Sequence, residues 1–160
     1  MPHDVSNSPD PQALKRRGRG QYPYFLSYRT RWIDNDQYSH VNNSVYYHLF
    51  DSVVNTYLIQ HAFLSPSHSS SIGLVVSSFC HFFSPLSFPA VLDLGLKVTA
   101  LGTSSVTYEV AVFEEGSSVP SAVGGYTHVF VHRETRTSTP IVAETREALA
   151  RLLPPSSAKL

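Results

Sequence analysis

Apolar and polar residues follow each other along the chain in patterns that predict one long helix and five strands. Between Ser44 and Phe63 apolar residues cover more than one helical stripe, which is typical of a helix that other elements cover on most sides. Elsewhere, runs rich in β-branched and aromatic residues favour strands. Val106, Tyr108 and Val110 alternate with Thr107 and Glu109, as expected for a strand with one buried face. The five predicted strands span about residues 24–32, 72–83, 90–101, 104–115 and 121–132.

Short turns join the later strands, which favours antiparallel pairing. Gly102-Thr103 and Glu115-Gly116-Ser117 supply such turns. No second long helix separates the last four strands, so the order predicts an α+β fold in which an antiparallel β-sheet wraps around one long central helix. A shorter helix is predicted over Ala143 to Leu153, before Pro154-Pro155.

Length and composition predict one globular domain with two tails. The chain has 160 residues, 42% of them hydrophobic, and a net charge of zero, which is enough for one buried core. We place the domain at residues 21–153. Residues 1–20 have few apolar side chains and a basic cluster at residues 15–20, which predicts a disordered basic tail. A solvated leader is favoured over a nuclear or RNA-binding role for this cluster.

Several classes of protein are disfavoured by the composition. A nucleic-acid binder would show a basic excess, and the long helix carries His48 and Asp51, so no membrane span is expected. The single Cys80 excludes an internal disulfide and fits a reducing compartment. The eight histidines lack a zinc-binding spacing, so no metal is predicted. Neither a Gly-x-Ser-x-Gly elbow nor a Gly-rich phosphate loop is present.

The C-terminal tail, residues 154–160, is predicted to be extended, and it carries a candidate address. Ala158-Lys159-Leu160 is a variant of the Ser-Lys-Leu peroxisomal signal. We therefore expect recognition by a peroxisomal import receptor, with a chance match and a cytoplasmic location as the alternative.

The chemistry most clearly suggested by the sequence lies between the first strand and the long helix. The turn formers Asp34-Asn35-Asp36 end the strand, and Asn42 and Asn43 offer an N-cap. A carboxylate therefore comes a few residues before a helix N-terminus, where backbone N–H groups are unpaired and the helix dipole is positive. Acyl transfer needs this pair, a base or nucleophile beside oxyanion donors. The alternative is that both Asp residues only stabilise the turn.

The same stretch resembles a family signature. Asp34-x-Asp36-x-x-x-His40-Val41-Asn42-Asn43-x-x-Tyr46 is similar to that of the 4-hydroxybenzoyl-CoA thioesterase-like branch of the hotdog-fold thioesterase superfamily. The resemblance runs from about residue 24 to 145, through Phe-x-x-Pro-Leu-x-Phe-Pro at 82–89 and Gly-x-Ser-Ser at 102–105. It implies a hotdog fold and an acyl-CoA thioesterase without a cofactor, CoA being part of the substrate. One departure is Ser39, where the family has Gly; a positive φ there would strain the loop.

The resemblance assigns roles within this stretch. Asp36 matches the catalytic Asp, as general base or as nucleophile. Asp34 is expected to be mainly structural. The backbone N–H around Asn43 would polarise the thioester carbonyl. His40 is a candidate partner of Asp36 or of the substrate carbonyl, with a purely structural role as the alternative. Asn42 is a cap and a candidate substrate contact.

Two further residues are candidate substrate contacts. Tyr46 would line the acyl pocket or only pack in the core. Ser77 lies where related sequences place a polar or acidic side chain on a strand that faces the site across a dimer. The exposed edge of the predicted sheet favours a homodimer or homotetramer. Two other functions stay open, a hydratase or dehydratase on an acyl thioester and a non-catalytic acyl-binding module.

Overall fold

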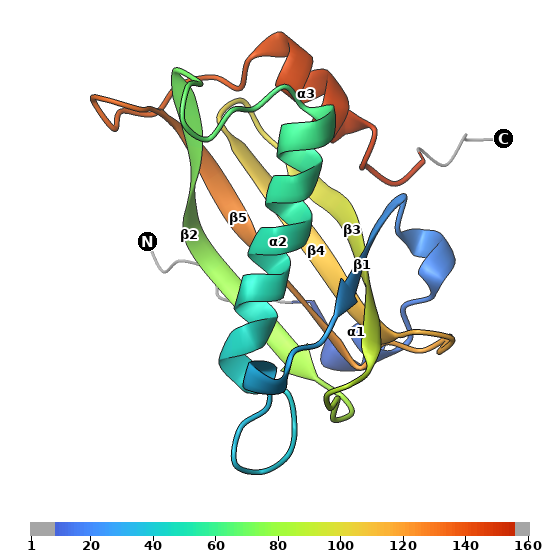
Figure 1. The fold of residues 1–160 in the computed structure, drawn as a ribbon. Helices are drawn as coiled ribbons and strands as arrows, with labels where there is room; N and C mark the ends of the chain where they lie inside the picture. The colour runs from blue at the N-terminus through green and yellow to red at the C-terminus, as the bar shows by residue number, and fades with distance from the viewer. Residues whose placement is uncertain (1–8, 156–160) are drawn as a thin grey trace, which may run out of the picture.

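The computed structural model describes residues 9–155, and its centre is a five-stranded antiparallel sheet that curls around the long helix α2 (Figure 1). The strand order β1-β3-β4-β5-β2 leaves β1 and β2 at the two edges. This arrangement confirms the predicted α+β fold. The strands are β1 (Tyr24–Arg29), β2 (Ser71–Phe82), β3 (Val91–Leu101), β4 (Ser105–Glu114) and β5 (Ala122–His132).

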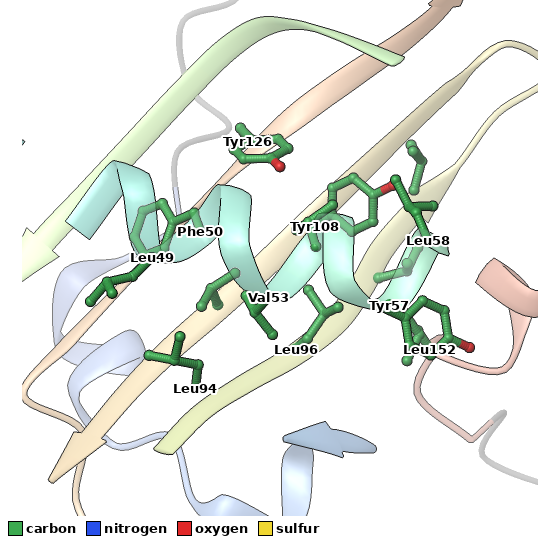
Figure 2. Close-up of a cluster of buried hydrophobic side chains, with 14 of the residues drawn as sticks. Leu49, Phe50, Val53, Tyr57, Leu58, Leu94, Leu96, Tyr108, Tyr126 and Leu152 are labelled. Carbon is green, nitrogen blue, oxygen red and sulfur yellow. The ribbon is translucent and has the colours of Figure 1, made fainter. Parts of the chain in front are cut away.

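Helix α2 (Asn43–His61) lies against the concave face of the sheet and buries one stripe of side chains. Figure 2 shows the stripe packed beside Leu94 and Leu96 of β3. The opposite flank is exposed, including Tyr47 and Ile59. The helix is therefore covered along one side within the chain, not on most sides as its apolar pattern predicted. The buried residues, spaced three and four apart, are Tyr46, Leu49, Phe50, Val53, Val54, Tyr57 and Leu58.

The outer face of the sheet carries the short helix α1 (Pro11–Lys15), followed by a 3-10 turn at Arg19–Gln21. Leu14 is fully buried in a second apolar cluster with Phe113. The Arg17 guanidinium pairs with the buried Glu109 at 2.9 Å. The prediction of disorder up to residue 20 is therefore wrong for residues 9–20, because one apolar anchor and an ion pair to the sheet hold this segment. Residues 1–8 lie outside the described part of the chain.

The C-terminal helix α3 (Ala143–Ala150) packs on the end of α2. The Thr145 hydroxyl donates to the Ala62 carbonyl at 2.7 Å, and the Tyr57 hydroxyl to the Ala148 carbonyl at 2.6 Å. None of the helices within residues 9–155 is long and apolar enough to cross a membrane. The tripeptide at residues 158–160 lies outside the described residues, so peroxisomal import stays a prediction.

Candidate functional site

The loop between β1 and α2 is anchored at its start by Asp34. This residue ends a 3-10 turn (Trp32–Asp34) and is 1% exposed. Its carboxylate accepts hydrogen bonds from the Tyr28 hydroxyl at 2.9 Å, the Arg31 backbone N–H at 2.8 Å and the Arg31 guanidinium at 2.9 Å. Burial alone would raise the pKa of Asp34, but the bonds from Arg31 and Tyr28 hold that pKa below its usual value. Asp34 is thus a structural carboxylate.

The connection between β2 and β3 fixes the loop from the side. The Val41 N–H donates to the Leu86 carbonyl at 2.8 Å, and the Phe88 N–H donates to Asn35 Oδ1 at 3.1 Å. The ring of Trp32 packs edge-on against the ring of Phe88, with centroids 5.8 Å apart. The loop therefore has a defined position although it is largely exposed.

Ser39 takes the left-handed conformation, with φ at 66°. A non-glycine residue there costs about 1–2 kcal/mol. The Ser39 carbonyl accepts a hydrogen bond from the Ser87 hydroxyl, and the Ser39 N–H donates to the Asp36 carbonyl at 3.1 Å. The departure from the family pattern thus falls on a position where glycine would be unstrained.

Asp36 is half-buried and lies beside a small hollow in the loop, which we call the loop hollow. This hollow has a volume of about 190 Å³ and is lined by Trp32, Asn35, Asp36 and Ser39. One carboxylate oxygen accepts from the Tyr38 N–H at 2.8 Å, and the other from the Asn42 side-chain amide at 3.4 Å. Each oxygen therefore keeps a lone pair for a further donor.

Asn42 joins this carboxylate to the start of α2. It is the N-cap, and its side-chain oxygen accepts from the Ser44 N–H at 2.9 Å. Its amide nitrogen is the donor to Asp36. The N-terminus of the 19-residue helix α2, and with it the positive end of the helix dipole, lies at this point. The arrangement favours negative charge beside the helix start.

A second hollow, the helix-end hollow, lies at the start of α2. Its volume is about 290 Å³. Sequence reasoning did not single out Phe82, Phe83 and Pro85 as part of a site, although the Phe-x-x-Pro spacing was visible. The hollow is lined by His40, Val41, Asn43, Tyr46, Phe82, Phe83, Ser84 and Pro85.

The predicted site residues are therefore divided between two neighbouring hollows. Asn43, His40 and Tyr46 meet in the helix-end hollow, whereas Asp36 lines the loop hollow. The backbone carbonyl of His40 accepts from the Asp36 N–H at 2.9 Å. Among the described residues, no hydrogen bond joins the His40 imidazole to the Asp36 carboxylate. Asn42 is the side chain that bridges Asp36 and the helix.

Ser77 lies elsewhere within one chain. It pairs with Thr127 of β5 on the outer face of the sheet, and it lines a separate hollow with Arg17. A register shift between Val75 and Ser77 precedes it in β2. Such a bulge changes which face a side chain takes. Within residues 9–155, no group of three His, Cys, Asp or Glu side chains could hold a metal ion.

The chain is similar in sequence and structure to known proteins. The family described as "Thioesterase superfamily" matches residues 38–121. The PA5185 protein from Pseudomonas aeruginosa strain PAO1 is 48% identical, with a TM-score of 0.85 over 86% of this chain and 96% of that chain. Curated protein sequences give no match.

Two more distant structures are similar in fold alone. The SAV2348 protein from Staphylococcus aureus, solved in complex with CoA, is 15% identical, with a TM-score of 0.74 over 81% of this chain and 82% of that chain. Slr0204, a 1,4-dihydroxy-2-naphthoyl-CoA thioesterase from Synechocystis, is 16% identical, with a TM-score of 0.72 over 79% of this chain and 95% of that chain.

Proposed function

This chain belongs to the thioesterase superfamily, and on that basis we propose that it hydrolyses an acyl-CoA to the free acid and CoA. The observation that carries the proposal is the hydrogen-bonded chain from the Asp36 carboxylate through the Asn42 side chain to the first turn of α2. A basic group and the N-terminal end of α2 are thereby held next to each other.

In the proposed reaction, Asp36 takes a proton from water, whose oxygen attacks the thioester carbonyl, or attacks that carbonyl itself. The carbonyl oxygen gains negative charge and is stabilised by the backbone N–H of Asn43. One such donor contributes about 3 kcal/mol to the transition state. The carbon–sulfur bond then breaks, and the CoA sulfur leaves and is protonated. Where Asp36 is the nucleophile, the acyl group is left on its carboxylate as an anhydride, which water then hydrolyses to the free acid.

The two hollows suggest where each reactant lies. We place the acyl group in the helix-end hollow, because Asn43 and Tyr46 line it. The attacking water lies beside Asp36, whose oxygens retain free lone pairs. The proposal therefore requires the Asp36 carboxylate, which lines the loop hollow, to act on a carbonyl held in the helix-end hollow.

The edge of the sheet formed by β2 supports a proposal about a second copy of the chain. Val75 and Val76 of β2 are 47% and 61% exposed. We propose that two copies pair along β2, which would cover these side chains and could bring Ser77 toward the partner's site. Light scattering on the purified protein would give twice the monomer mass, and monomer alone would contradict the pairing.

The reaction is tested with a panel of acyl-CoAs and a colorimetric measurement of free thiol. Asp36→Asn should lose nearly all turnover while keeping its melting temperature. Glu115→Gln, in the exposed turn after β4, makes the same chemical change away from both hollows and should keep full turnover. Equal turnover by Asp36→Asn and wild type would refute the role of Asp36. Enoyl-CoA hydration without thiol release would instead identify a hydratase.

One observation favours a second function, an acyl-binding module. Both Asp36 oxygens already accept a hydrogen bond, and the residue lines a different hollow from Asn43. Such a site could hold an acyl group without attacking it. Tight binding of acyl-CoA by calorimetry, with no thiol release for any chain length, would select this function.

A further inference from the structure

Tyr46 has a hydroxyl without a protein partner at the helix-end hollow. The residue is 3% exposed, and its ring packs edge-on against Phe82 with centroids 5.0 Å apart. Among residues 9–155 no hydrogen bond involves its hydroxyl. The hydroxyls of Tyr108 and Tyr126 also lack partners but are sealed in the core, whereas Tyr46 lines the helix-end hollow. It is thus a buried side chain with a polar end that a ligand can reach.

This hydroxyl is neutral and can both donate and accept. Burial and the neighbouring Cys80 thiol raise the pKa of Tyr46 to about 12. A protonated phenol suits a ligand hydroxyl or carbonyl oxygen equally well. Leaving it unpaired against an apolar group would forfeit a hydrogen bond.

The position of Tyr46 along α2 sets where that oxygen would lie. Asn43 and Tyr46 are three residues apart, which is roughly 4.5 Å along the helix axis. An acyl group whose carbonyl is held at the Asn43 N–H therefore lies within one helical turn of Tyr46. Both residues line the helix-end hollow, so an acyl oxygen beyond the carbonyl can bond to the Tyr46 hydroxyl there.

The hollow is also small, and aromatic and apolar residues form part of its lining. Its volume of about 290 Å³ lies at the lower end of ligand pockets. Phe82, Phe83, Pro85 and Val41 line it, together with the polar residues His40, Asn43 and Ser84. A long unbranched chain would have to leave the hollow into water, which loses the burial of its apolar surface.

We propose that Tyr46 selects short acyl groups that carry a hydrogen-bonding oxygen at their far end, an inference that rests on the proposed thioesterase function. A site built to hydrogen-bond a substrate oxygen discriminates against the analogue that lacks it, because its own polar group is then left unpaired. Phe82 and Phe83 contact the rest of the acyl group, and the Tyr46 hydroxyl forms a hydrogen bond with the oxygen at its end.

The test compares hexanoyl-CoA with 6-hydroxyhexanoyl-CoA in wild type, Tyr46→Phe and Tyr47→Phe. Tyr47 is next in the sequence but lies on the exposed flank of α2, so its variant removes a hydroxyl without changing the hollow. Wild type should have the higher kcat/KM for the hydroxylated substrate. Tyr46→Phe should lower this preference about three- to tenfold, the effect of one neutral hydrogen bond, and Tyr47→Phe should retain it. The ratio is measured within one preparation, so the fraction of folded enzyme cancels.

The outcomes separate this inference from the proposed function. An equal preference in wild type and Tyr46→Phe, with thiol released from both substrates, would overturn the role of Tyr46 and leave the thioesterase assignment standing. Absence of thiol release from any substrate would overturn the thioesterase assignment. In that case, calorimetry with the two matching non-hydrolysable thioethers decides: a hydroxyl preference lost in Tyr46→Phe supports the selectivity, and no preference refutes it.

Discussion

Asn42 makes two hydrogen bonds with different consequences, and two substitutions separate them. Its oxygen caps α2 through the Ser44 N–H at 2.9 Å, and its amide nitrogen donates to Asp36 at 3.4 Å. Asn42→Ser keeps a capping oxygen but removes the amide donor. Asn42→Ala removes both.

The expected magnitudes follow from these contacts. Loss of an N-cap costs about 1 kcal/mol, which in a domain of this size lowers the melting temperature by about 2–4 °C. The bond to Asp36 involves a charge but is long, so we assign it about 1 kcal/mol, a factor of roughly five in kcat. Asn42→Ser should therefore lose activity and keep its stability, whereas Asn42→Ala should lose both.

Thermal unfolding and thiol release measure the two effects on the same preparations. Asn55→Ala is the matched control, because Asn55 is an amide of α2 that bonds only to the Asp51 carbonyl among the described residues. It should leave both quantities nearly unchanged. Full activity in Asn42→Ser would show that the amide does not position Asp36. If Asn42→Ser melted at a temperature as low as that of Asn42→Ala, the capping oxygen would not be the stabilising contact.

Two further predictions concern the same loop. Ser39→Gly removes the strain of the left-handed backbone but adds conformational freedom to the unfolded chain, so it should raise the melting temperature by about 1–3 °C. Ser39→Ala keeps a Cβ in the left-handed conformation and should not raise it. An equal rise in both variants would contradict the presence of strain. The pKa of Asp34 is lower in the folded protein than in the unfolded chain, so the ionised carboxylate stabilises the fold above about pH 4. This stabilisation is lost as the pH falls through the pKa of Asp34 in the folded protein. Asp34→Asn should flatten the loss of urea resistance between about pH 5 and pH 2, and an unchanged slope would refute the linkage.

Local chemistry made the main elements predictable. Asn42 and the apolar residues after it predicted a helix that begins within one residue of the observed start at Asn43. The alternation at Val106 and Tyr108 predicted β4, and the turn formers at Gly102 and Gly116 marked its two ends. In each case the interactions that decide the element join residues a few positions apart, so the local sequence pattern is enough to predict it.

The site was less predictable, because its parts come from distant segments. Ser77 follows a bulge that places it on the outer face, and no local pattern marks a bulge in an edge strand. Phe82 and Phe83 become part of the helix-end hollow only when the end of β2 meets the start of α2. The same holds for Leu14, which is ordered because the sheet offers it an apolar cluster.

The sequence by itself determined the helix, its cap, the hairpins and the carboxylate that precedes the helix, since propensity, capping and alternation act over a few residues. Only the tertiary structure decided that Asp36 and Asn43 open into different hollows. The reason is that a side chain's surroundings depend on which distant segments pack against it. That information lies in the packing of the β2–β3 connection on the loop, through contacts such as the Val41 N–H to the Leu86 carbonyl.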